Sequence, residues 1–164
     1  MNRPFKILKR ETRILGLDTC NPGLSIGAVV RGGLYLDGIV SFPSKVDTES
    51  LATAIRETKY FAELRLIMLH DSNSGPHYLQ IIHRTTGLPV IAVWTTSSIH
   101  TSAERQRKRR LQRWDAVGLD RSMLKRIRTM TEANGALPEP VRIAHLLAKM
   151  NVFGGRSEDI GRDP

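Results

Sequence analysis

The sequence predicts an α/β fold in which helices flank a mixed β-sheet and the elements follow the order βββαβαβ. Short apolar runs separated by turn signals precede Pro43, and helical spacing begins near Thr48. Two later apolar runs are nearly continuous, as in strands that are buried on both faces of a sheet. At 164 residues, the chain has the length of one domain with a substantial core.

The first three predicted strands form an antiparallel meander. Asn21-Pro22-Gly23 and Gly32-Gly33 supply turn chemistry between them. The strands are Arg13 to Cys20, Leu24 to Arg31 and Leu34 to Ser41. Asp18 therefore lies inside a strand, which is an unusual place for a carboxylate.

The central part of the chain predicts alternating helices and buried strands. A helix is expected from Thr48 to Phe61, with Asp47, Thr48 and Glu49 in capping positions. The other elements of this part are a strand from Leu64 to Leu69, a helix from Pro76 to Gly87 and a strand from Leu88 to Trp94.

The remainder of the chain reads as helical. It contains a basic segment from Ser102 to Trp114, a helix near Arg121 to Met130 and an amphipathic helix after Pro138-Glu139-Pro140. We expect residues 1–11 to form an N-terminal extension, residues 12–153 to form one domain, and residues 154–164 to form a flexible tail.

Composition narrows the cellular setting. The apolar runs are far shorter than the roughly 20 residues that cross a bilayer, and no secretory signal is evident. The single cysteine, Cys20, rules out an intramolecular disulfide and a zinc cage built of thiolates from one chain. We therefore expect a cytoplasmic protein without a membrane partner.

The charge predicts a polyanionic partner. The formal net charge is +9 and the pI is near 10.3, which favours nucleic acid, although charge alone does not separate DNA, RNA, acidic lipid and acidic protein. The densest basic group is expected to bind phosphates, with a solvated helix face as the alternative. Its members are Arg105, Arg107, Lys108, Arg109, Arg110 and Arg113.

Three acidic residues are candidates for a metal site: Asp18, Glu49 and Asp71. An aspartate in the first strand and another at the end of the fourth is the plan of ribonuclease H-like nucleases. Such carboxylates hold one or two Mg²⁺ ions that activate water and neutralise charge on a scissile phosphate. Each residue also has a structural alternative, as a turn cap, a first-turn helix residue or a turn residue.

Four ordered stretches resemble the archaeal endonuclease dU family, whose members are similar to endonuclease V. Together the resemblance covers roughly residues 12–94 and 129–156, and the last stretch is the most specific. The stretches are Arg13-Ile-Leu-Gly-Leu-Asp18, Gly32-Gly33-Leu-Tyr-Leu-Asp37-Gly38-Ile39-Val40, Thr86-Gly87-Leu88-Pro89-Val90-Ile91 and Asn134-Gly135-Ala-Leu-Pro138-Glu139-Pro140-Val-Arg142-Ile-Ala144-His145-Leu146.

The resemblance implies a site of Asp18, Glu49 and Asp71 that binds Mg²⁺ or Mn²⁺, with Asp47 as the alternative second carboxylate. An ungapped alignment puts His70 where the family usually has aspartate, whereas a slip of one residue restores Asp71.

Histidines complete the implied site. A histidine six residues after Asp71 resembles the endonuclease V pattern, so His77 is expected to orient phosphate or water. Arg142 and His145 match the C-terminal motif and are expected either to contact the site or to serve packing.

The implied function is Mg²⁺-dependent endonucleolytic cleavage in DNA repair, on DNA with deaminated bases such as deoxyuridine. Two alternatives remain open, a nucleic-acid-binding protein of this fold without turnover and a nuclease acting on RNA. The sequence does not indicate an oligomeric state.

Overall fold

A computed structural model describes residues 9–19, 24–32, 35–43, 46–70, 75–95, 112–132 and 137–150. Within these ranges, six strands form one sheet in the order β3-β2-β1-β4-β5-β6. The strands are β1 (Arg13–Asp18), β2 (Leu24–Arg31), β3 (Tyr35–Pro43), β4 (Leu64–His70), β5 (Val90–Thr95) and β6 (Gln112–Val117). The helices are α1 (Thr48–Glu57), α2 (Pro76–Thr86), α3 (Arg121–Thr131) and α4 (Glu139–Lys149).

The sheet is mixed. β1, β4 and β5 run parallel, whereas β2 and β3 at one edge and β6 at the other pair antiparallel with their neighbours. The predicted order βββαβαβ is confirmed for the first seven elements. None of the helices in the described ranges has the length and apolar character that a membrane span needs.

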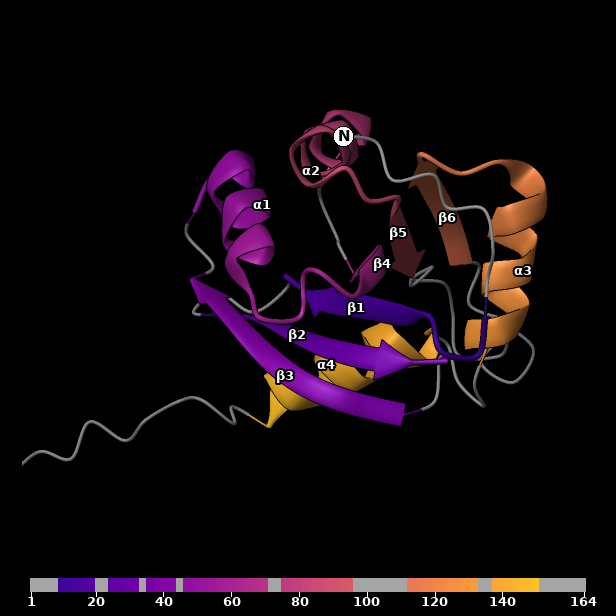
Figure 1. The fold of residues 1–164 in the computed structure, drawn as a ribbon, viewed down its shortest axis with the longest axis horizontal. Coiled ribbons are helices and arrows are strands. Elements are labelled where there is room, and N and C mark those ends of the chain that lie inside the picture. The colour runs from indigo at the N-terminus through magenta and orange to yellow at the C-terminus, as the bar shows by residue number, and fades with distance from the viewer. Residues whose placement is uncertain are drawn as a thin grey trace, which may run out of the picture.

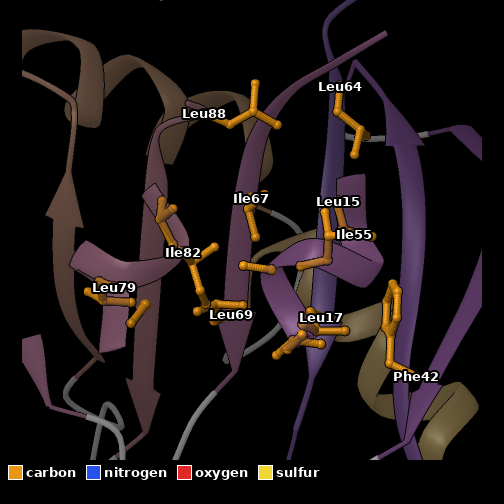
Figure 2. Close-up of a cluster of buried hydrophobic side chains, with 14 of the residues drawn as sticks. Leu15, Leu17, Phe42, Ile55, Leu64, Ile67, Leu69, Leu79, Ile82 and Leu88 are labelled. Carbon is orange, nitrogen blue, oxygen red and sulfur yellow. The ribbon is translucent and has the colours of Figure 1, made fainter. Parts of the chain in front are cut away.

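Helices cover both faces of the sheet (Figure 1). On one face, α1 and α2 pack on alternate residues of the central strands, and Figure 2 shows Leu15, Leu17, Ile67 and Leu69 gathered there. On the other face, α3 and α4 pack against the side chains that point the opposite way, such as Ile14. The continuous apolar runs of the sequence are thus explained by burial on two sides.

Local chemistry sets the helix ends. The Asp47 side chain accepts a hydrogen bond from the Ser50 backbone N–H at 2.9 Å, which caps α1. Gly87, with φ of 69°, ends α2 in the left-handed conformation. The predicted end of α1 at Phe61 was too late: the helix stops at Glu57, because the backbone of Thr58 is extended, and the Thr58 hydroxyl donates to the Ile55 carbonyl at 2.8 Å.

The prediction that the region before Trp114 is helical was wrong for residues 112–117, which form β6 at an edge of the sheet. Trp114 and Ala116 pack on the face covered by α3, whereas Val117 packs on the opposite face. This alternation is the period of a strand. The preceding run of basic residues hides it in the sequence.

Helix α4 lies unusually close to β1. A Cβ atom on Gly16 would be 2.1 Å from the Pro140 carbonyl oxygen and 2.8 Å from the Val141 nitrogen. Both are backbone atoms, so no rotamer change relieves such a contact. The glycine therefore allows the first turn of α4 to rest directly on the strand.

We predict that Gly16→Ser lowers the free energy of unfolding by about 1–3 kcal/mol, because the side chain forces α4 away from β1. Urea unfolding followed by circular dichroism measures the change. The matched control is Gly75→Ser, where an added Cβ meets nothing within 4 Å and serine suits the helix N-cap. Equal stability of the two variants would contradict the proposed close contact.

Candidate active site

Asp18 occupies the last position of β1 and has a relative exposure of only 1%. In a strand, residues two apart share a face, so Asp18 points to the same side as Gly16, the side that α4 covers. A carboxylate with so little exposure needs a cation or hydrogen-bond donors to offset its lost hydration.

The neighbouring strand brings a second polar group. β1 and β4 are parallel, and their register places Asp18 opposite His70, the last residue of β4. The Nδ1 atom of His70 lies 3.4 Å from Asp18 Oδ2. Parallel pairing therefore joins the ends of two strands that are 52 residues apart in the chain.

The third group comes from α4. His145 Nδ1 lies 2.5 Å from the same Asp18 oxygen, which is shorter than the roughly 2.7–2.9 Å of a charge-assisted N–H···O hydrogen bond. The rings of His70 and His145 meet edge to face, with centroids 5.0 Å apart. Both imidazoles thus converge on one buried carboxylate oxygen.

The cluster of Asp18, His70 and His145 has the composition of a metal site. One donor atom from each residue can be chosen so that all three lie within 4.8 Å of one another. In the described part of the chain, this is the one group of three such residues that is close enough to hold an ion. The same contacts equally suit a hydrogen-bonded Asp–His pair that exchanges protons.

Glu49 lies in the first turn of α1 and Asp47 is the N-cap of that helix, whereas the cluster residues come from β1, β4 and α4. Glu49 is largely exposed, and its Oε1 atom lies 3.4 Å from Nη2 of Arg84 on α2. Asp47 caps the helix, and hydrogen bonds from the Ser50 hydroxyl and backbone N–H hold the pKa of its carboxyl below its ordinary value. Neither residue belongs to the cluster around Asp18.

The other predicted site residues are distributed as follows. His77 is exposed in the first turn of α2. Arg142 makes two hydrogen bonds of 2.6 Å to Glu139, which raise the pKa of its guanidinium. Arg113 on β6 pairs with Asp115 at 3.1 Å. Asp71 and the basic residues 105–110 lie outside the described residues.

A basic groove lies near the start of β1, whereas Asp18 ends that strand. It has a volume of about 430 Å³ and is lined by Lys9, Arg10, Lys125, Arg126, Thr129 and Met130. Sequence analysis missed this groove. The alternation of basic and apolar residues in α3 was the available signal, but the Lys9–Arg10 contribution comes from far away in the chain.

Sequence comparison relates the chain to archaeal proteins without an assigned activity. No protein-family model matches it. It is 26% identical to a UPF0215 protein of Methanosarcina acetivorans, over 90% of this chain and 94% of the relative. It is also 28% identical to a UPF0215 protein of Methanosarcina barkeri, over 94% and 97%.

Solved structures share the fold. A protein of unknown function from Archaeoglobus fulgidus superposes with a TM-score of 0.63 and 22% identity, over 85% of this chain and 97% of that one. Human ENDOV, an endonuclease V, gives 0.62 and 13%, over 88% and 85%. Marinitoga piezophila Argonaute in complex with guide RNA and target DNA gives 0.53 and 11%, over 87% and 30%.

These neighbours confirm the predicted fold class. This chain has a six-stranded mixed sheet with helices on both faces, and the fold that it has in common with endonuclease V and Argonaute is ribonuclease H-like. The name endonuclease dU is carried by none of the relatives described above. The chain is thus similar over most of its length to archaeal UPF0215 proteins, and its fold is one found in nucleases.

Proposed function

We propose that this protein is a metal-dependent endonuclease that acts on nucleic acid, with DNA containing deaminated bases such as deoxyuridine as its first candidate substrate. The observation that carries the proposal is the buried Asp18 carboxylate at the end of β1, with His70 and His145 directed at it. The likeness of the fold to endonuclease V and Argonaute, together with this polar cluster at one edge of the sheet, favours phosphodiester cleavage as the reaction. The preference for deaminated bases is taken from the family resemblance.

The described donors do not fit Mg²⁺. This ion prefers six oxygen ligands in octahedral geometry and retains several waters. Here two of the three donors are imidazole nitrogens, and Glu49 faces Arg84. We therefore derive no catalytic step through Mg²⁺.

His145 is the residue we assign to proton transfer. Its Nδ1 atom faces Asp18 Oδ2 at 2.5 Å, so the carboxylate orients the ring and favours the tautomer that carries the proton on Nδ1. Nε2 is then the nitrogen that accepts a proton from water or returns one to the leaving oxygen. In this scheme Asp18 is a positioning residue for His145.

Cleavage assays test the proposal directly. Labelled duplexes carrying one deoxyuridine, one deoxyinosine or no lesion, and an RNA of the same sequence, are incubated with Mg²⁺, Mn²⁺ or Zn²⁺ and with EDTA. We expect metal-dependent nicking that falls at least about a hundredfold in Asp18→Asn, since removal of a positioned acid–base pair costs roughly 10²–10⁴ in rate.

The matched control is Asp120→Asn, which alters a carboxylate that caps α3 and should retain activity. Tight binding without nicking by the wild-type protein would contradict the nuclease proposal and indicate a nucleic-acid-binding protein without turnover. Nicking of RNA but of none of the DNA duplexes would show that the substrate is RNA and not DNA with deaminated bases.

The basic groove supports a polyanionic partner, because cations from the start of the described chain and from α3 line one cavity. We predict that Lys125→Glu/Arg126→Glu weakens DNA binding and lowers the slope of log K against log salt by about 1.8, since each phosphate contact contributes about 0.9. Fluorescence anisotropy at several salt concentrations measures both quantities.

The control for net charge is the double variant Arg56→Glu/Lys59→Glu, which replaces two exposed cations near the end of α1 and so changes the net charge of the protein by the same amount. We expect this control to keep the wild-type slope. Equal losses in both double variants would show that overall charge, and not the groove, determines binding.

A further inference from the structure

We propose that Asp18, His70 and His145 form a site for a first-row transition-metal dication of the Zn²⁺ type, and that this site discriminates against Mg²⁺. The inference goes beyond the proposed function and does not depend on nuclease activity. An ion bound by His145 Nδ1 takes the place of the hydrogen bond from that nitrogen to Asp18, so the proton-transfer role assigned to His145 belongs to the ion-free cluster. The inference rests on the donor chemistry, the spacing and the burial of these three side chains.

The donor set matches known preferences. Imidazole suits Zn²⁺, Cu²⁺, Fe²⁺ and Ni²⁺, whereas Mg²⁺ is held by carboxylates, carbonyls and water. Catalytic zinc sites commonly have three protein ligands, such as two histidines and one carboxylate, with one position left open. Asp18, His70 and His145 supply this number and these types of ligand.

The spacing is close to that of a bound ion. Ligands about 2.0–2.2 Å from a tetrahedral metal lie about 3.4 Å apart, and the Asp18 Oδ2 and His70 Nδ1 atoms are separated by 3.4 Å. His145 Nδ1 is hydrogen-bonded to Asp18 Oδ2 at 2.5 Å. Metal binding then requires this pair to separate by roughly 1 Å, which a small rotation of one ring on α4 provides.

The burial gradient also suits an ion. The side chain of Asp18 is 1% exposed, whereas those of His70 and His145 are 12% and 26% exposed. The carboxylate thus lies at the bottom of the cluster and the two imidazoles lie toward solvent. An ion that enters past the histidines meets a negative charge that the protein has removed from water, where attraction to a cation is strongest.

His83 shows what a structural histidine looks like in this protein. Its Nδ1 atom lies 2.7 Å from the backbone carbonyl of Leu88, and its ring packs against Gly118. By contrast, the imidazoles of His70 and His145 converge with a carboxylate from three different elements. Convergence of this kind distinguishes a ligand set from a local packing contact.

Metal binding to the purified full chain tests the inference. After EDTA treatment and dialysis, the protein is titrated calorimetrically with Zn²⁺ and with Mg²⁺, and bound metal is counted by mass spectrometry. We expect one Zn²⁺ per chain, bound at least about a hundredfold more tightly than Mg²⁺. We expect His70→Ala and His145→Ala each to weaken Zn²⁺ binding at least tenfold, while His77→Ala leaves it unchanged.

His70→Asp provides a sharper variant, because it restores a second carboxylate beside Asp18. We expect it to lower the preference for Zn²⁺ over Mg²⁺ at least tenfold while the fold is kept, as checked by circular dichroism. Zn²⁺ affinity that is unaltered in folded His70→Ala and His145→Ala variants would overturn the inference, as would wild-type protein that binds Mg²⁺ as tightly as Zn²⁺.

The two proposals fail in different ways. Zn²⁺ binding that depends on His70 and His145, without cleavage of any nucleic acid, supports the metal site and contradicts the nuclease. Cleavage that requires Mg²⁺ and is unaffected by His70→Ala supports the nuclease and contradicts the metal site.

Discussion

The direct contact between β1 and α4 at Gly16 is the constraint on which the candidate site depends. With no side chain at this position, the backbone of Pro140 and Val141 rests on the strand. His145 lies a little more than one turn further along the helix, and Asp18 lies two residues further along the strand. One close backbone contact therefore brings together two side chains that are 127 residues apart.

Strand pairing supplies the rest of the site. Because β1 and β4 are parallel and in register, Asp18 and His70 end neighbouring strands at the same edge. The central strands β1 and β4 are almost entirely buried, so close packing leaves these two residues little freedom. The third residue, His145, sits on a helix that buries Val141, Ala144 and Ala148 against the sheet. The site thus combines two rigid strand positions with one helical position.

The fold was readable from the sequence because its signals are local. Turn residues, apolar runs and caps identified the first seven elements, and the burial of Asp18 follows from its place within a strand. β6 was missed because a basic run masks its alternation. His70 and His145 were named as accessory candidates, but their convergence on Asp18 was not predicted, since no local pattern reports how closely α4 approaches β1. Glu49 lies outside the Asp18 cluster and pairs with Arg84, so its role as a metal ligand stays a prediction.

A double-mutant cycle between Asp18 and His145 tests most directly whether β1 and α4 build one site. Unfolding free energies are measured by urea denaturation for Asp18→Asn, His145→Gln and the double variant. Residues in direct contact typically show coupling of about 0.5–3 kcal/mol, and a 2.5 Å hydrogen bond to a buried carboxylate predicts a value in this range. Additive effects within about 0.3 kcal/mol would contradict the account, because the two side chains would then act independently.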